Sequence, residues 1–133
     1  MKLEREHNSR IQGTDGLGRA IGWFASHGYI VSVPLTDSQS YDLVVDKGLG
    51  LKRVQVKTST SRADSGGWNV HLRTCGGNRS WSGIVKHWDK TGSEFLFIVT
   101  GDGSTYFIPS DAIEARSVIV VGRTRYNEYL VTG

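Results

Sequence analysis

"YDLVVDKGLGLKRVQVKTST" spans Tyr41–Thr60 and predicts a β-hairpin. Strand-forming residues fill 41–46 and 51–58, and the segment between them contains glycines, which favour tight turns. A symmetric turn places Asp42 directly opposite Gln55. The hairpin therefore decides which polar side chains can meet, and the remaining elements are placed around it.

Three polar side chains converge in this predicted register. Side chains alternate between the two faces of a strand, so Gln55 and Lys57 share one face. Opposed residues bring their Cβ atoms to about 5 Å and diagonal ones to about 7–8 Å, which places Asp42 near both. Asp42, the Gln55 amide oxygen and the Val56 carbonyl offer oxygen ligands to Mg²⁺. Lys57 can hold or activate a water and offset charge on a phosphate. The cluster suits phosphodiester hydrolysis, although such spacing by itself more often marks an ordinary solvated cross-strand pair.

A helix is expected over 15–29, before the hairpin, because apolar residues recur there at helical spacing. Thr14 or Asp15 can cap its start. Gly18 and Gly22 weaken this helix by roughly 1 kcal/mol each, or they allow close packing against a strand.

Alternating or continuous apolar runs predict the other elements. Further strands are expected over 29–35, 68–74, 94–100, 104–109 and 117–122, and a short helix over 109–115 capped by Ser110. This order predicts an α/β (α+β) fold, a single domain over residues 1–133 in which helices flank a mixed β-sheet.

Basic residues are concentrated in the middle of the chain. The 133 residues carry a formal net charge of +3. The segment 51–86 contains seven Lys and Arg residues and one Asp, a net charge of +6. Such a block favours a polyanionic partner, and a solvated basic face is the alternative.

Nothing in the composition indicates a membrane or a secreted protein. No apolar run reaches membrane-spanning length, and the first residues lack the apolar stretch of a signal peptide. The single cysteine, Cys75, cannot form an internal disulfide. We therefore expect a soluble, intracellular (cytoplasmic) protein.

The hairpin segments "YDLVV" and "RVQVKTS" resemble the active-site hairpin of the PD-(D/E)xK nuclease superfamily, in the variant where Gln replaces the second acid. The most similar group contains small endonucleases, among them intron-encoded homing endonucleases and phage-borne relatives. The resemblance covers most of the chain, through "IGWFASHGYIVSVPLTDSQSYDLVVD", "VHLRTCGGNRS" and "EFLFIVTGDGSTYFIPSDAI". It implies a restriction-endonuclease-like core and a Mg²⁺-dependent DNA endonuclease that also accepts Mn²⁺, in a bacterial or phage setting.

The resemblance also implies roles for individual residues. Asp42 corresponds to the motif aspartate, Gln55 to the second ligand and Lys57 to the motif lysine. Relatives often carry a glutamate in the first helix, where this chain has Leu17. Asp15 is then expected to complete the metal shell, unless an N-terminal glutamate, Glu4 or Glu6, does so.

DNA contacts are expected from the basic segment. The candidates for phosphate contact are Lys52, Arg53, Ser59, Arg62, Arg73, Asn78, Arg79 and Lys86. Trp81 and Trp88 lie near this segment and are candidates for stacking on bases.

Three functions are compatible with these features. The first is a homing-endonuclease-like enzyme that hydrolyses DNA. The second is a Holliday-junction-resolving or other structure-specific nuclease of the same superfamily, and the third is a non-catalytic DNA-binding module with the nuclease fold. One active site cuts one strand, so cleavage of both strands implies a homo-dimer or a higher homo-oligomer.

Overall fold

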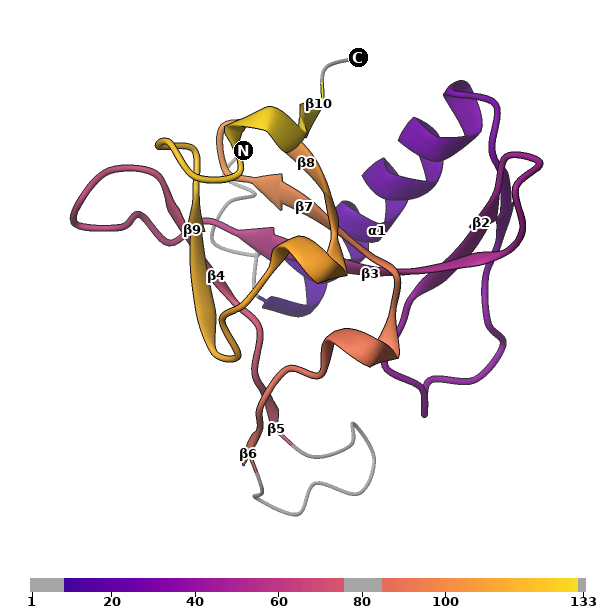
Figure 1. Cartoon of the computed structure of the whole chain (residues 1–133), viewed down its shortest axis with the longest axis horizontal. Helices are drawn as coiled ribbons and strands as arrows, with labels where there is room; N and C mark the ends of the chain where they lie inside the picture. Colours follow the sequence, from indigo (N-terminus) through magenta and orange to yellow (C-terminus); the bar gives the residue numbers. More distant parts are fainter. Residues whose placement is uncertain (1–8, 76–84, 132–133) are drawn as a thin grey trace.

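A six-stranded mixed sheet lies at the centre of this computed structural model, which describes residues 9–75 and 85–131. Its strands lie in the order β1-β2-β3-β7-β8-β10 (Figure 1). β3 and β7 run parallel, and the other neighbouring strands run antiparallel. The strands are β1 (Ile30–Ser32), β2 (Leu43–Asp46), β3 (Lys52–Ser59), β7 (Phe95–Thr100), β8 (Thr105–Pro109) and β10 (Leu130–Val131).

The predicted hairpin forms in the predicted register. Leu43 pairs with Val54 and Val44 with Arg53, which continues to Asp42 opposite Gln55. The backbone N–H of Asp42 donates to the Val54 carbonyl at 2.9 Å. The register prediction is therefore confirmed.

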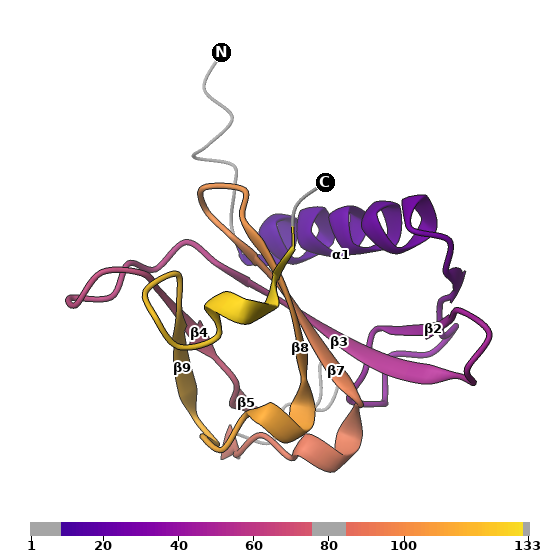
Figure 2. The ribbon, with the colours of Figure 1, turned by 45° about the horizontal axis from the view of Figure 1, so that its top comes forward.

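Each face of the sheet buries its own apolar core. Helix α1 (Ser9–Ser26) covers one face, and the ribbon of β4 (Trp68–His71) and β9 (Val118–Val121) covers the other (Figure 2). β7 serves both cores because its residues alternate: Phe97 packs towards α1, and Leu96 and Ile98 pack towards the ribbon. Burying one such side chain contributes about 1.5–3 kcal/mol. The smaller elements are β5 (Thr74–Cys75), β6 (Val85–Lys86), η2 (Lys90–Gly92), η3 (Ser110–Ala112) and η4 (Asn127–Tyr129).

Helix α1 begins earlier than the sequence suggested. It starts at Ser9, so Thr14 and Asp15 lie inside the helix rather than at its cap. The Thr14 hydroxyl donates to the carbonyl of Arg10, four residues earlier, which is a bond made within a continuing helix. The helix extends because its first turns also pack on β3, where the Gln12 amide donates to the Thr58 hydroxyl at 3.1 Å.

Two further local expectations are wrong. The first strand is shorter than the apolar run, because β1 pairs with β2 only over Ile30–Ser32. Ser110 begins a 3-10 helix but its side chain caps nothing, and its buried hydroxyl has no partner within the described residues.

The close helix–strand contact falls at Gly16, not at Gly18 or Gly22. A Cβ atom at Gly16 would lie 2.2 Å from Cγ2 of Thr58, whereas one at Gly18 or Gly22 would meet nothing within 4 Å. The side chain of Thr58 is stiff because it branches at Cβ. Gly16 is therefore required by packing, and the other two glycines are not.

Alanine substitutions at the three glycines of α1 should change the stability of the protein in different directions. We expect Gly16→Ala to destabilise the protein by about 1–3 kcal/mol through overpacking against Thr58. Gly18→Ala and Gly22→Ala should stabilise it by up to about 1 kcal/mol each, since alanine favours the helix and has room. Urea unfolding followed by circular dichroism measures all three. Equal effects at Gly16 and Gly18 would contradict the assigned contact.

Candidate active site

Asp42 and Lys57 form the charged centre of a cluster on the sheet face opposite α1. Residues Val54 and Val56 of β3 pack towards the helix, so the alternating residues Gln55 and Lys57 point to the other face. Burial raises the pKa of the Asp42 carboxyl, and the Val56 amide and the Lys57 ammonium oppose that rise. Burial lowers the pKa of Lys57, and the Asp42 charge opposes that fall. Two partly buried groups of opposite charge therefore lie close enough to influence each other's pKa.

Backbone groups of β3 orient the Asp42 carboxylate. The N–H of Val56 donates to Asp42 Oδ2 at 2.8 Å. Asp42 lies just before the first residue of β2. Its carboxylate therefore accepts the bond from the Val56 N–H, where a backbone carbonyl would accept it if the strand pairing continued. Alternate residues of a strand turn their backbone groups to the same neighbour. The carbonyl of Val56 thus faces the Asp42 side, as the Val54 carbonyl does.

Gln55 is held by a residue whose role the sequence did not reveal. The Trp88 indole N–H donates to Gln55 Oε1 at 2.9 Å. Trp88 is only 7% exposed and belongs to the core beneath the β4–β9 ribbon. The prediction that Trp88 stacks on DNA bases is therefore wrong. No local pattern indicates this contact, because the two residues lie far apart in the chain.

The oxygen atoms of the cluster fit a hard divalent cation. An oxygen of a carboxylate or an amide has two lone pairs, so Asp42 and Gln55 can each accept one hydrogen bond and still bind a cation. Mg²⁺ takes such oxygen ligands and keeps several waters. No group of three or more His, Cys, Asp or Glu side chains suited to a metal occurs within 9–75 and 85–131. Asp42, Gln55 Oε1 and the Val56 carbonyl are the oxygen ligands that this cluster offers to a cation.

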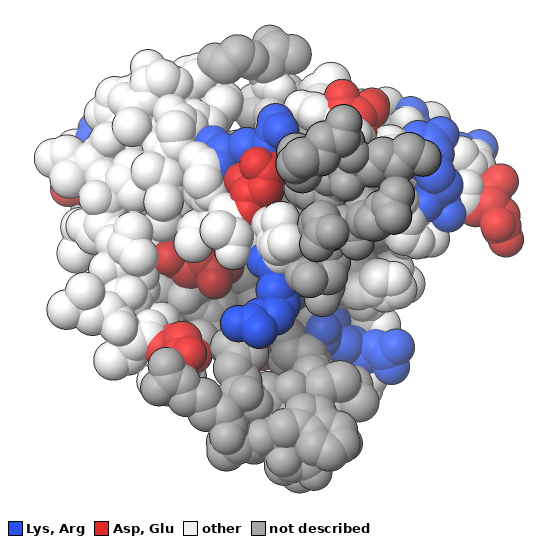
Figure 3. Space-filling model, turned by 180° about the vertical axis from the view of Figure 1, so that it is seen from behind, with Lys and Arg blue, Asp and Glu red and all other residues white. Residues whose placement is uncertain are grey.

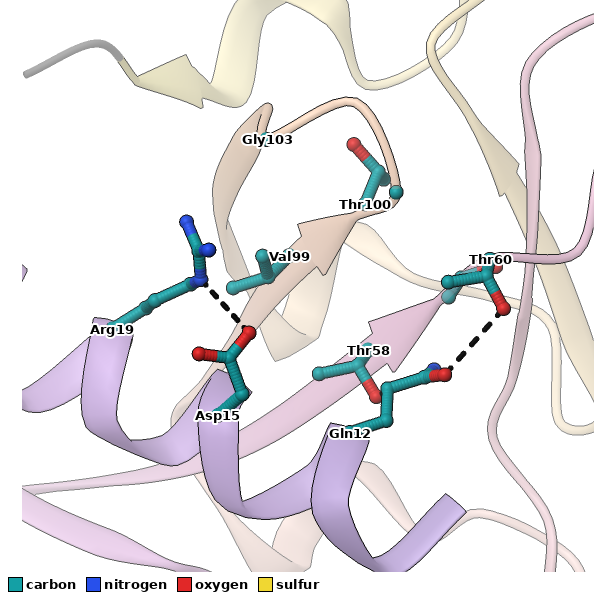
Figure 4. Close-up of a pocket in the computed structure, with 10 residues that line it drawn as sticks. Gln12, Asp15, Arg19, Thr58, Thr60, Val99, Thr100 and Gly103 are labelled. Atoms are coloured by element: carbon teal, nitrogen blue, oxygen red, sulfur yellow. Dashed lines mark hydrogen bonds and ion pairs between the residues drawn. The ribbon is translucent and has the colours of Figure 1, made fainter. Parts of the chain in front are cut away.

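Asp15 is not part of the cluster, and its metal role stays a prediction. It lies on exposed helix surface, where it accepts from Arg19 at 3.1 Å. Both residues line a cavity of about 510 Å³ between α1, the end of β3 and the β7–β8 turn (Figure 4). α1 covers the opposite face of the sheet, and Leu17 packs into the core there. Glu4 and Glu6 lie outside the described residues.

Two of the residues predicted to contact phosphate have partners within the protein. Ser59 is buried, and its hydroxyl donates to the carbonyl of Asn69. Arg53 forms an ion pair with Glu94 at 2.5 Å and also donates to the Thr91 carbonyl. The bonds from Arg53 lower the pKa of Glu94 to about 2. The sequence does not reveal these partners, since β7 and β4 bring them in from later in the chain.

The other residues that were predicted to contact DNA phosphate lie at separate places on the surface. Lys52, Arg62 and Arg73 are exposed, and the Arg62 guanidinium lies over the Trp68 ring at 4.4 Å. The face in Figure 3 shows Lys and Arg side chains in separate groups, with Asp and Glu between them. Asn78, Arg79 and Trp81 lie outside the described residues, as does the side chain of Lys86.

Across the described segments, no helix is both long and apolar enough to cross a bilayer.

Comparisons with known proteins agree with this architecture. A bacterial homing endonuclease, I-Ssp6803I, is 26% identical in sequence and has a TM-score of 0.78; the alignment covers 93% of this chain and 89% of that chain. MepB is 12% identical with a TM-score of 0.45, over 84% of this chain and 83% of that chain, which is too distant to support an argument. No curated protein matches.

The family comparison covers the whole hairpin. The family model described as PD-(D/E)XK endonuclease matches residues 7–128, a segment that includes Asp42, Gln55 and Lys57. The match takes in nearly all of the chain, and the chain belongs to the PD-(D/E)XK endonuclease family.

Proposed function

We propose that this protein hydrolyses phosphodiester bonds of DNA at the cluster of Asp42, Gln55 and Lys57, with Mg²⁺ or Mn²⁺ as its cofactor. The observation that carries the proposal is the bond from the Val56 amide that holds the Asp42 carboxylate opposite Gln55, on the sheet face that Lys57 shares. The family match supports endonuclease chemistry, and the similarity to a homing endonuclease supports DNA as the substrate.

Each residue of the cluster has a distinct task. Asp42, Gln55 Oε1 and the Val56 carbonyl would hold the divalent cation. When bound, this cation would offset negative charge on the scissile phosphate. Lys57 provides a second positive charge, whose effect is strong because the site is partly shielded from water. The Val56 amide keeps Asp42 in one orientation, so the carboxylate does not have to reorganise when the cation binds.

The same chemistry serves linear and branched DNA. A structure-specific nuclease would differ in the shape of the DNA that it holds, while Asp42 and Lys57 would act alike. A non-catalytic module remains the contrasting function, because Leu17 offers no carboxylate and packs into the core. Cleavage assays on both kinds of DNA separate these functions.

An apolar patch at the edge of the sheet suits a second copy of the chain. We name the exposed side chains of Ile30, Leu49 and Leu51 the hairpin patch; they are 70%, 88% and 71% exposed. Ile30 lies on the outer strand β1 opposite Asp46, and the two leucines follow in the adjoining turn. Contiguous exposed apolar surface is typical of protein interfaces. Asp46 and Lys47 beside the patch carry opposite charges, so a two-fold contact can pair them.

Removing either charged group of the cluster should abolish cleavage. Asp42→Ala and Lys57→Ala are expected to slow plasmid cleavage in millimolar Mg²⁺ by about 100-fold or more, because each removes charge stabilisation of the reacting phosphate. Asp111→Asn and Arg125→Ala change exposed charged residues outside the cluster, the basic segment and the hairpin; they are the controls and should cut normally. Chelation of the metal should stop the wild type. If Asp42→Ala cuts as fast as the wild type on both linear and four-way DNA, the site is wrongly assigned.

The rate of cleavage should depend on pH in a bell shape. Protonation of Asp42 removes its charge, and its raised pKa means that activity is lost on acidification sooner than an exposed aspartate would allow. The lowered pKa of Lys57 means that its charge, and with it activity, is lost on the alkaline side sooner than for an exposed lysine. Rates measured across pH at one fixed Mg²⁺ concentration well below saturation check this, because the free protein then predominates. Lys57→Arg should lose the alkaline decline, since arginine keeps its charge; an unchanged decline would exclude Lys57 as its source.

The hairpin patch should control self-association. Leu51→Glu is expected to convert a dimer into a monomer, because two copies would bring like charges together in an apolar contact. Leu130→Glu on β10, at the opposite edge of the sheet, is the control and should leave the dimer intact. Analytical ultracentrifugation measures the mass. A monomeric wild type, or a Leu51→Glu dimer as stable as the wild type, would remove the patch as the interface.

A further inference from the structure

We propose that Trp88 is a positioning residue of the active site, which holds the Gln55 side chain with its amide oxygen in one fixed direction. This inference rests on the proposed function, because it concerns how Gln55 serves the divalent cation. It assigns a task to a residue outside the hairpin that contains Asp42, Gln55 and Lys57.

The surroundings of Trp88 make it a rigid donor. Its side chain is almost completely buried, in a cluster with Leu72, Leu96 and Ile113. Its backbone N–H donates to the carbonyl of Arg116 at 2.9 Å, which ties the segment before η2 to the segment before β9. A side chain packed in this way has little rotational freedom. The direction of its indole N–H is therefore set by the core.

The chemistry of the indole decides which end of the Gln55 amide it meets. An indole nitrogen can only donate a hydrogen bond, so its partner at 2.9 Å must be the oxygen and not the NH₂ group. Without this donor, the amide could turn by half a rotation and exchange its two ends. The NH₂ group would then face the position of the cation, where it can only repel it.

This constraint matters because glutamine has two different ends. The two oxygens of a glutamate are equivalent, so a glutamate at the same position would bind a cation in either rotation. A glutamine needs a neighbour that selects its oxygen. Partners of this kind, behind the groups that bind a metal, orient those groups and change metal affinity when removed. The bond from Trp88 is thus the feature that fits a glutamine to this site.

A double-mutant cycle tests the proposal. Trp88→Phe keeps a ring in the core but removes the donor, and we expect the Mg²⁺ concentration for half-maximal cleavage to rise about 10-fold. In the Gln55→Glu background the same Trp88→Phe change should raise it less than about 2-fold, because the carboxylate needs no selection. General damage to the core would lower activity alike in both backgrounds, and that outcome would overturn the positioning role.

A further measurement does not depend on cleavage. The indole N–H signal of Trp88 in ¹⁵N-edited NMR should exchange slowly with water in the wild type, and faster in Gln55→Ala, which lacks the acceptor. Trp68→Phe makes the same chemical change in the same core and is the matched control. It should lower the melting temperature without changing the Mg²⁺ dependence. An indole signal that Gln55→Ala leaves unchanged would show that the bond does not form.

The outcomes separate this inference from the proposed function. If the wild type cuts DNA but Trp88→Phe shows the same Mg²⁺ dependence, the positioning role fails and the proposed function stands. If the wild type cuts no DNA with Mg²⁺ or Mn²⁺, the proposed function fails, and the role of Trp88 towards the cation fails with it.

Discussion

The backbone pairing of β2 with β3 is the constraint on which the site depends. It places Asp42 opposite Gln55, and it leaves the Val56 amide free of a strand partner so that the amide can bind the Asp42 carboxylate. A shift of one residue would turn Gln55 and Lys57 towards α1 and bring valines to the other face. The apolar core under α1 opposes that shift, since Val54 and Leu43 are fully buried there. The packing that stabilises the fold therefore also sets the geometry of the cluster.

The two faces of the sheet have different roles: the face under α1 holds an apolar core, and the other face also holds the polar cluster. The face under α1 is filled by aromatic and branched side chains, and Gly16 lets the helix approach β3 closely. The other face is covered by the β4–β9 ribbon, and the polar cluster lies on this side. Partial burial there perturbs the pKa values of Asp42 and Lys57 in opposite directions. Such paired shifts are typical of functional sites, because a charge in a shielded position acts strongly on a substrate.

Residues with local signals were predicted well, and those held by distant partners were not. The hairpin, its register and the alternation of Gln55 with Val56 follow from strand periodicity and turn length, which are local properties. Arg53 and Ser59 are of residue types that often contact phosphate. In the structure, Arg53 forms an ion pair with Glu94, and the Ser59 hydroxyl donates to the Asn69 carbonyl. Asp15 was near Leu17 in sequence, yet α1 carries it to the opposite face from Asp42.

The sequence by itself determined the hairpin, its polar triad and the family resemblance, because these depend on short-range spacing and residue type. Only the tertiary structure decided what surrounds the triad. It seats Trp88 against Gln55 and places Asp15 on the other face of the sheet, since both positions depend on which elements cover each face. Layer packing is a sum of many weak apolar contacts between distant segments, and no short pattern in the chain encodes it.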